Sequence, residues 1–368
     1  ATVLKEWKMY FDLLPSKPII KEIHLGGGTP TFFSPEHLTE LIQGITKNAE
    51  VSADHEFSVE VHPNYTTYEH LKALADVGFN RISLGVQDFD PQVQFVINRI
   101  QSFEKTKEVV EWARALNYAS VNIDLVYGLP KQTVESVEHT IANIKQLMPN
   151  RIAFYSYAHV PWKSKVQRRY SDDDVPKANE KWEMYHVGRK QLLAAGFDAI
   201  GMDHFALPND KMFAAAKEEK LHRNFMGYTT TQTKLIIGLG ASSISDSWDG
   251  FIQNEKEVEA YEEKIAQGIF PIVAGHKLTA EDEVLRKNIL ELMCNDKTNL
   301  QPDLLGNELA DEMKIKLQKL TEDNFIELNG NSIVVKENGK LFVRIIAAAI
   351  DARLLRKQST GNTFSKAI

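Results

Sequence analysis

The stretch "EIHLGGGTPTFF", residues 22–33, joins an apolar run to three consecutive glycines, a threonine and a proline. The run over 19–25 that contains its start has the composition of a β-strand, and Ser34-Pro35 directly after it is typical of a helix N-terminus. A tight turn into that helix would need one glycine. Three in a row leave N–H and C=O groups open to a ligand, which favours backbone contact with a ligand at the end of the strand.

Two common nucleotide-binding loops do not fit this stretch. It lacks the G-x-G-x-x-G spacing of dinucleotide-binding folds, and no Gly-Lys-Ser/Thr follows, as a phosphate-binding P-loop would require. The segment "GLGASSIS" at 238–245 comes closer to the first pattern, but its third glycine is missing.

Strand-like runs alternate with helical patterns on either side of the glycines. Alternation at this spacing predicts right-handed crossovers and a parallel sheet. Six runs are too many for most small open sheets and too few for a full eight-fold barrel, so we predict an α/β fold built as a partial barrel. The six runs are 19–25, 56–63, 81–89, 120–130, 151–160 and 197–206.

The last part of the chain differs in kind. From about residue 278 three helical segments surround a hairpin signal, Asn329-Gly330, between two apolar runs. Three helices and a hairpin resemble a winged-helix module, a shape that often binds DNA. This segment has no dense basic face, and fold alone does not give function, so we predict a structural lid or cap.

The composition excludes some classes of binding partner. The net charge of −7 argues against a general role on nucleic acid or on a membrane surface. No apolar run reaches the roughly 18 residues of a membrane span. Cys294 is the only cysteine, so no internal disulfide can form, which fits a reducing cytoplasm. We expect a cytoplasmic monomer with no nucleic-acid or membrane partner.

Polar residues gather where the predicted strands end, which is where parallel barrels form their sites. A carboxylate such as Glu60 or Asp124 inside an apolar run is costly unless an internal ion pair or a ligand compensates it. Arg99 is either part of such a site or a solvated helix-end charge, and His204 and His222 could be structural histidines. The strand-end candidates are Glu60, His62, Gln87, Asp88, Asp124, Tyr157, His159, Asp203 and His204.

Several segments together carry a family resemblance. "GGGTPTFF", "SVEVHP", "RISLGVQDFD", "NIDLVYGLPKQT", "GMDHFALP" and "HRNFMGYTT" occur in this order. The chain resembles, over nearly its whole length, the oxygen-independent coproporphyrinogen III oxidases of the radical S-adenosylmethionine (SAM) superfamily. GGGTP also occurs in related haem chaperones, whereas "GMDHFA" with "HRNFMGYTT" points to the oxidase branch.

The resemblance implies a fold and an activity. The fold is an incomplete (βα)6 TIM-like barrel, here lacking its first strand, over residues 1–272, with a helical winged-helix-like C-terminal domain over 273–368. A [4Fe–4S] cluster cleaves SAM, and the resulting radical attacks two propionates of coproporphyrinogen III, which become the vinyl groups of protoporphyrinogen IX. Two SAM molecules and an unidentified electron donor are implied. The alternative is a non-catalytic tetrapyrrole-binding or haem-transfer protein on the same fold.

The resemblance also implies site residues, although it assigns no catalytic side chain. By motif position, Gly27 and Glu60 would contact the first SAM. Met226 stands where relatives often have Gln and could alter substrate placement. The residues implied for the second SAM are Gly28, Thr29, Gln87, Arg99, Asp124, Ala158 and Ile244.

One dense cationic loop follows the fifth predicted strand, on the expected active-site face. It is either an ordinary solvated loop or a surface that recruits the propionates of the substrate, because arginine suits bidentate carboxylate binding. Its cations are Lys163, Lys165, Arg168 and Arg169.

The sequence departs from the family pattern at the cysteines that bind the [4Fe–4S] cluster. Relatives hold it with C-x3-C-x2-C after the first barrel strand, and no such motif occurs here. Cys294 alone cannot supply the thiolates that an iron–sulfur cluster needs, so we expect no metal ligands in this chain. We expect the sequence to be part of a longer enzyme rather than a cluster-free protein, with the first strand, the cluster loop and a tyrosine near the first SAM lying outside it. We therefore predict that the 368-residue chain is inactive alone.

Overall fold

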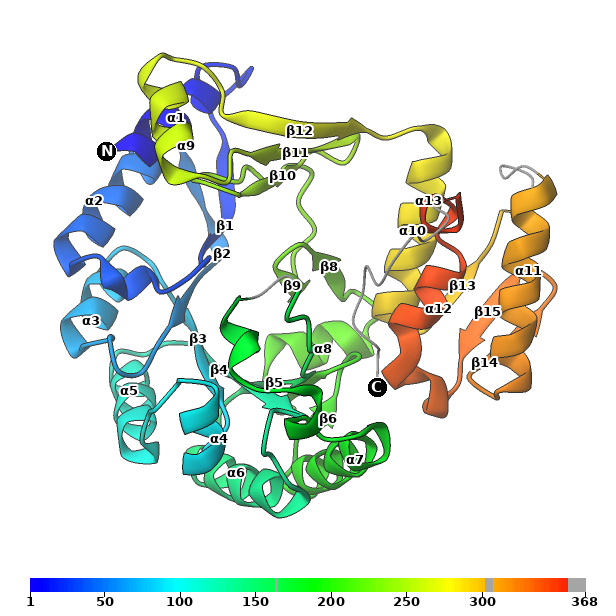
Figure 1. Ribbon diagram of the computed structural model, residues 1–368. Helices are drawn as coiled ribbons and strands as arrows, with labels where there is room; N and C mark the ends of the chain where they lie inside the picture. Colours follow the sequence, from blue (N-terminus) through cyan, green and yellow to red (C-terminus); the bar gives the residue numbers. More distant parts are fainter. Residues whose placement is uncertain (163–164, 302–306, 357–368) are drawn as a thin grey trace.

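The computed structural model describes residues 1–162, 165–301 and 307–356. Its centre is a seven-stranded sheet in the order β1-β2-β3-β4-β5-β7-β6, in which β1 to β5 are parallel (Figure 1). The α/β class with a mostly parallel sheet is confirmed. The strands are β1 (Ile19–Leu25), β2 (Glu50–Val61), β3 (Arg81–Gln87), β4 (Ser120–Tyr127), β5 (Arg151–Ser156), β6 (Asp198–Ala199) and β7 (His204–Ala206).

Five helices line the outside of this sheet, and a sixth, short helix follows the end of β3 (Figure 1). Alternate strand residues such as Phe57, Leu84 and Ile123 are buried against them in one large apolar core. Ser34 caps the first of these helices, as its position before Pro35 predicted. The helices are α2 (Pro35–Thr46), α3 (Tyr68–Asp76), α4 (Pro91–Val96), α5 (Phe103–Ala115), α6 (Val134–Leu147) and α7 (Ala178–Ala194).

The prediction that residues 197–206 form a sixth parallel strand is wrong. Residues 197–206 form not one parallel strand but the hairpin β6–β7, and β7 lies antiparallel beside β5. The chain reverses at Gly201, where a Cβ would lie 2.7 Å from the Tyr228 ring. Because β7 runs backwards, its first residue, His204, still lies toward the end of the sheet where β1 to β5 finish.

Antiparallel pieces that the alternation did not predict follow the main sheet. A hairpin of β8 (His222–Asn224) and β9 (Gly227–Thr229) comes first, after α8 (Lys211–Lys217). A three-stranded sheet follows, and α9 packs against the first helix of the chain, α1 (Thr2–Phe11). The elements of this part are β10 (Ile244–Asp246), β11 (Gly250–Asn254), α9 (Val258–Ala266) and β12 (Ile272–Lys277).

Buried Glu6 ties α1 to these pieces. Its carboxylate accepts hydrogen bonds from Gly240 N at 2.8 Å, Tyr261 Oη at 2.7 Å and Asn254 Nδ2 at 2.6 Å. Burial raises the pKa of Glu6, and these three donors oppose the rise. The segment "GLGASSIS" is therefore fastened to α1 through Gly240.

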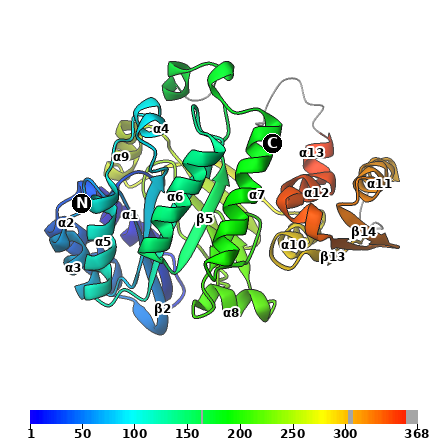
Figure 2. The same cartoon turned by 90° about the horizontal axis from the view of Figure 1, so that it is seen from below.

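The C-terminal helices group on one side of the main sheet (Figure 2) and have a second apolar core. The hairpin predicted at Asn329-Gly330 is confirmed, with Gly330 at φ +61° in its turn. A third strand, β13, was missed because its three residues, Lys-Thr-Asn, show no apolar alternation. The elements are α10 (Ala280–Asn295), β13 (Lys297–Asn299), α11 (Asn307–Glu322), β14 (Ile326–Asn329), β15 (Ser332–Val335), α12 (Val343–Ala349) and α13 (Ala352–Arg356).

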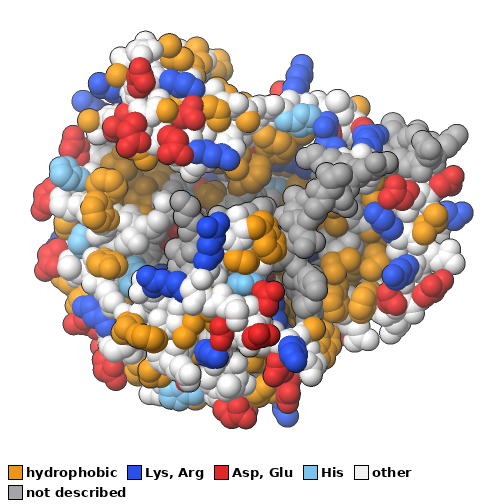
Figure 3. Space-filling model, viewed as in Figure 1, with side chains coloured by type: hydrophobic (Ala, Val, Ile, Leu, Met, Phe, Trp, Pro, Cys, Tyr) orange, Lys and Arg blue, Asp and Glu red, His pale blue; other side chains and the backbone are white. Residues whose placement is uncertain are grey.

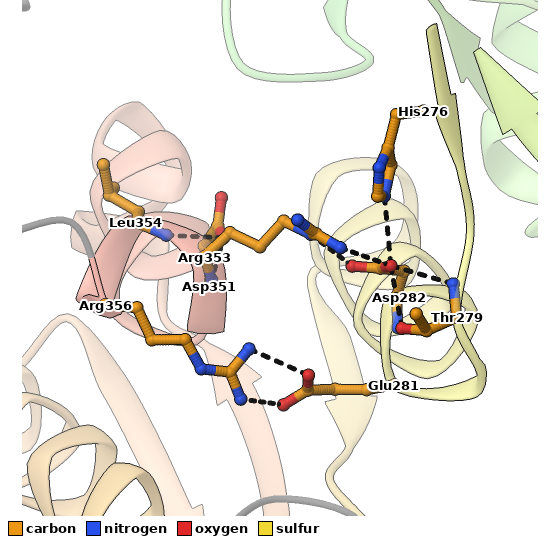
Figure 4. A network of polar contacts seen from close by, with 8 residues as sticks. All are labelled: His276, Thr279, Glu281, Asp282, Asp351, Arg353, Leu354 and Arg356. Carbon is orange, nitrogen blue, oxygen red and sulfur yellow. Dashed lines mark hydrogen bonds and ion pairs between the residues drawn. The ribbon is translucent and has the colours of Figure 1, made fainter.

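Ion pairs join α13 to the start of α10 (Figure 4). Asp282 accepts from Arg353 Nη2 at 2.7 Å, from His276 Nε2 at 3.1 Å and from Thr279 N at 2.9 Å. These contacts hold the Asp282 pKa far below its usual range, with the Arg353 hydrogen bond as the largest cause. Asp282 is thus both part of the α10 capping box and the anchor of α13.

Candidate functional site

The face of the sheet that is turned away from the helices is polar. In β4, Val121, Ile123 and Leu125 belong to the apolar core, while the alternating residues Asn122 and Asp124 point to the opposite face. The molecule is hollowed at the centre of the view in Figure 3, inside the ring of helices seen in Figure 1. Period-two alternation therefore directs every second strand residue toward this hollow.

The two ends of this polar face differ in charge pairing. Toward the amino ends of the strands, Arg81 pairs with Glu56, and Arg151 Nε lies 2.7 Å from Asp210 Oδ1. Toward the carboxyl ends, Asp124 forms no ion pair with any residue that the structure describes. The opposite charges near the amino ends pair with one another, so the unpaired carboxylate lies at the other end.

The glycine loop lies at that carboxyl end. Gly27 has φ +80° and Gly28 φ +141°, conformations that glycine adopts without strain. A Cβ on either would meet no heavy atom within 4 Å, so the space in front of both is open. Gly26 serves packing instead, because a Cβ there would lie 2.8 Å from His24 Nε2. An open glycine backbone fits the ligand-contact prediction.

Glu60 stands beside this loop. Its Oε1 lies 3.2 Å from His24 Nε2, and His24 Nδ1 lies 2.9 Å from Ser58 Oγ. The Glu60 side chain remains 44% exposed, so its carboxylate can still bind a ligand. Sequence reasoning missed His24 and Ser58, although both share the period-two face of Glu60.

Asp124 is surrounded by neutral donors. Ser83 Oγ donates to it at 3.1 Å and Asn122 Nδ2 at 2.8 Å. Burial raises the pKa of the Asp124 carboxyl, and these two hydrogen bonds oppose the rise. Asn122 Oδ1 is buried with no partner among the described residues. An unpaired carboxylate beside an unsatisfied amide oxygen is a polar surface suited to a ligand with N–H and O–H groups.

Gln87 and Arg99 converge on the end of β3. Gln87 has φ +71° at an irregularity in the β3–β4 pairing. Arg99 Nε donates to Gly85 O at 3.1 Å, and burial lowers the Arg99 pKa against the opposing charge of Asp124. Arg99 is therefore not a solvated helix-end charge but a half-buried cation lying over the strand.

His204 belongs to the same side of the sheet. It pairs with Ala153 across the β5–β7 ladder, and Ala153 is the ladder neighbour of Asp124. Its Nδ1 lies 2.6 Å from Asp203 Oδ1. Burial alone would raise the Asp203 pKa, but this hydrogen bond and the nearby positive charges together lower it. The Tyr155 and Tyr228 rings lie edge-on to it, at 5.7 and 5.1 Å. His204 is held by its neighbours and faces the site as well.

Other candidates are not brought into the hollow. Asp88 is fully buried, accepting from Thr140 Oγ1 at 3.1 Å and from Gln132 Nε2. Burial raises the Asp88 pKa to about 6. Its contacts are structural, between the end of β3 and α6. His222 stacks on Trp248, with ring centroids 5.9 Å apart, and Tyr157 and His159 contact Tyr170 in the loop after β5.

The remaining predicted residues lie on loops and short elements around the sheet. Ala158 follows β5, where its carbonyl accepts from Gln167 Nε2 at 3.2 Å. Thr29 precedes a 3-10 turn, Ile244 begins β10, and Met226 is 49% exposed at the tip of the β8–β9 hairpin. His62 stacks against Tyr65, and burial lowers its pKa to about 4.

The cationic loop after β5 is partly described. Lys163 lies outside the described residues, and Lys165 is placed in the 3-10 turn Lys165–Arg169. Arg168 is exposed and donates from Nε to Pro161 O at 3.0 Å, and Arg169 is exposed too. The loop therefore presents two arginines to solvent beside the carboxyl end of β5.

The residues present do not fit an iron–sulfur cluster. Within the described residues no three or more His, Cys, Asp or Glu side chains gather as metal ligands. Cys294 lies on α10, where burial raises its thiol pKa to about 11, so it is far from a ready thiolate. Three cluster cysteines are not found among these 368 residues.

Comparison with known proteins decides the family. Residues 2–144 match the model of the Radical SAM superfamily. The oxygen-independent coproporphyrinogen III oxidase of Pseudomonas aeruginosa is 36% identical over 96% of this chain and 78% of its own length. The chain belongs to the oxygen-independent coproporphyrinogen III oxidases. An anaerobic coproporphyrinogen III oxidase of Cereibacter sphaeroides is 39% identical over 96% of this chain and 79% of its own length.

A solved structure gives the same answer. The coproporphyrinogen III oxidase of Escherichia coli, described as a radical SAM enzyme, aligns with a TM-score of 0.90 and 35% identity over 96% of this chain and 82% of that chain. These relatives are named as oxidases, which favours the enzyme over the haem-transfer alternative. Membership implies SAM and a [4Fe–4S] cluster as cofactors of the family.

Proposed function

We propose that this oxidase converts two propionates of coproporphyrinogen III to vinyl groups, giving protoporphyrinogen IX in haem biosynthesis. The observation that carries the proposal is the relation to named oxidases over 95–100% of the chain at 36–39% identity. The open glycine loop and the unpaired Asp124 at one end of the polar face support it, because they provide backbone and carboxylate partners for SAM.

Two SAM molecules are our proposal for the occupants of this end of the sheet. The first would contact the Gly27 backbone and the Glu60 carboxylate, which His24 orients at 3.2 Å. The second would contact Asp124, which suits ribose hydroxyls or amino groups. The other proposed contacts of the second SAM are Gly28, Thr29, Gln87, Arg99, Ala158 and Ile244.

The chemistry divides between cofactors and protein. When bound, SAM with a reduced cluster would supply the radical chemistry that removes hydrogen from a propionate side chain. The chain's own residues bind and orient SAM and keep water from it. The cluster thiolates are not among the 368 residues, so we assign none of these residues to holding the cluster.

We also propose a division of the chain into two domains, a location in the cell and an oligomeric state. We propose an incomplete (βα)6 barrel over residues 1–272 and a winged-helix-like cap over 273–368, supported by the two separate apolar cores. A cytoplasmic monomer served by an unidentified electron donor is proposed as well. No helix in the described residues is long and apolar enough to cross a bilayer.

Two anaerobic titrations of the 368-residue chain test the function. Calorimetry with SAM, and fluorescence with coproporphyrin III as the stable form of the substrate, should each give saturable binding. Haem is the comparison ligand. A chain that binds haem tightly, but neither SAM nor coproporphyrin III, would support the haem-transfer alternative and overturn the proposal.

A further inference from the structure

The β8–β9 hairpin carries an arginine for which the described residues supply no hydrogen-bond acceptor. Arg223 Nη1 is buried and has no hydrogen-bond partner among the described residues. The guanidinium lies 4.7 Å from the centroid of the Tyr228 ring. Arg223 forms no ion pair with a described carboxylate, and Asp203 is hydrogen-bonded to His204 instead. A buried N–H of a charged group without an acceptor is costly, so an incoming carboxylate would stabilise this position.

Arg223 is connected to the candidate site through two aromatic contacts. The Tyr228 ring on which it stacks lies edge-on to His204, 5.1 Å away. His204 in turn pairs with Ala153 of β5, and Ala153 pairs with Asp124 of β4, so His204 lies on the same part of the sheet as Asp124. The guanidinium therefore lies at the side of the SAM-binding end, toward the C-terminal helices.

A second cation approaches from those helices. Arg344 is exposed on α12 and forms no ion pair with a described residue. The helix α12 packs on α10, and α10 in turn contacts β8, the strand that carries Arg223. The two guanidiniums therefore belong to elements that meet at α10.

The tip of the same hairpin is apolar and exposed. Phe225 is 54% exposed and Met226 49%, and they occupy the two-residue turn between β8 and β9. The Phe225 ring lies edge-on to Phe251 of β11, 5.3 Å away, so the tip is supported from behind. An exposed apolar turn on the hairpin that carries Arg223 matches a ligand with a flat apolar body and carboxylate arms.

We propose that Arg223 and Arg344 bind a propionate of the tetrapyrrole that is not reacting, while Phe225 and Met226 pack against the macrocycle. This inference rests on the proposed function and names the residues that position its substrate. Arg223 and Arg344 are positioning residues and take no part in the radical step. Met226 gains a role here that glutamine would fill less well, because an apolar side chain suits the apolar face of a macrocycle.

The test uses the 368-residue chain and two fluorescent probes, coproporphyrin III and its tetramethyl ester. Arg223→Gln should weaken binding of the acid about tenfold or more at low salt and leave binding of the ester unchanged. Arg344→Gln should have a smaller effect in the same direction. Phe225→Ser with Met226→Ser should weaken both probes. Arg189→Gln, which removes a cation paired with Glu337, is the matched control.

Each other result overturns the inference. If the wild-type chain binds the acid and Arg223→Gln binds it equally well, the guanidinium serves packing only. If Arg223→Gln instead weakens SAM binding, it serves the carboxylate of SAM. If the wild-type chain binds neither probe, the proposal that coproporphyrinogen is the substrate is wrong as well. Arg223→Lys, which keeps the charge without the bidentate geometry, should bind the acid with intermediate affinity and guards against misfolding of the glutamine variant.

Discussion

At the residue scale, the unpaired carboxylates decide where the cofactor binds. We predict that Asp124→Ala and Glu60→Ala each weaken SAM binding by about 1–3 kcal/mol, the usual range for a charge-assisted hydrogen bond. Both should leave the unfolding temperature within a few degrees of wild type, because Asp124 contacts only neutral donors and Glu60 contacts His24 from a side chain that is 44% exposed. Calorimetry and thermal unfolding measure the two effects. Unchanged SAM affinity in both variants would contradict the assignment.

Asp88 gives a residue-scale prediction about pH. Burial raises its pKa to about 6 from the ordinary 3.8, so between these values the folded state holds a proton that the unfolded state has released. Its contribution to stability therefore falls as pH rises through this window, by about 3 kcal/mol in total. In Asp88→Asn the free energy of unfolding should no longer fall with pH through this window, and it should differ from wild type by an amount that does not depend on pH. Denaturant unfolding of both proteins from pH 4 to 7 measures it, and parallel curves would refute it.

At the element scale, the loop after β5 provides a second prediction about the substrate. Gln167 fastens it to Ala158 O, which keeps Arg168 and Arg169 beside the end of β5. In an oxidase that carries its cluster segment, Arg168→Ala with Arg169→Ala should raise the Michaelis constant for coproporphyrinogen more than that for SAM. The gap should shrink at high salt. Wild-type substrate dependence at low salt would make the loop an ordinary solvated surface.

The junction between α10 and α13 is also an element-scale feature. Asp282→Ala removes a helix cap and the acceptor for Arg353, so it should lower the free energy of unfolding by about 2–4 kcal/mol. Arg356→Gln is the matched control, because its pair with Glu281 is half exposed and should be worth less than about 1 kcal/mol. Denaturant unfolding compares them. Equal losses in the two variants would mean that Asp282 is no anchor.

At the scale of the whole molecule, the cysteine count sets a limit on what this chain can bind. The 368 residues contain one cysteine, which is half-buried, and burial raises the pKa of its thiol to about 11. Anaerobic reconstitution with iron and sulfide should therefore give no stoichiometric [4Fe–4S] absorbance and no oxidase activity, while SAM binding persists. Ultraviolet–visible and paramagnetic resonance spectra measure the cluster. A brown, stoichiometric species on this chain would disprove the prediction.

The sequence alone determined the features that depend on neighbouring residues. Strand and helix periods predicted the parallel order of β1 to β5, because period-two and period-3.6 patterns are local. The strand-end residues Glu60, Gln87 and Asp124 followed from this order, since parallel strands finish at one edge. Gly27 and Gly28 were recognisable because no turn needs three glycines.

Tertiary structure alone decided what depends on distant partners. The chain reverses at Gly201, beside the distant Tyr228, and this reversal makes β7 antiparallel. Asp88 is a buried structural group because it contacts Thr140 and Gln132, which also lie far away in the sequence. The same holds for Arg223, whose missing acceptor becomes visible only once the chain around it is folded. A residue's type limits the bonds that it can make, but burial and the positions of distant groups determine which of those bonds remain open to a ligand.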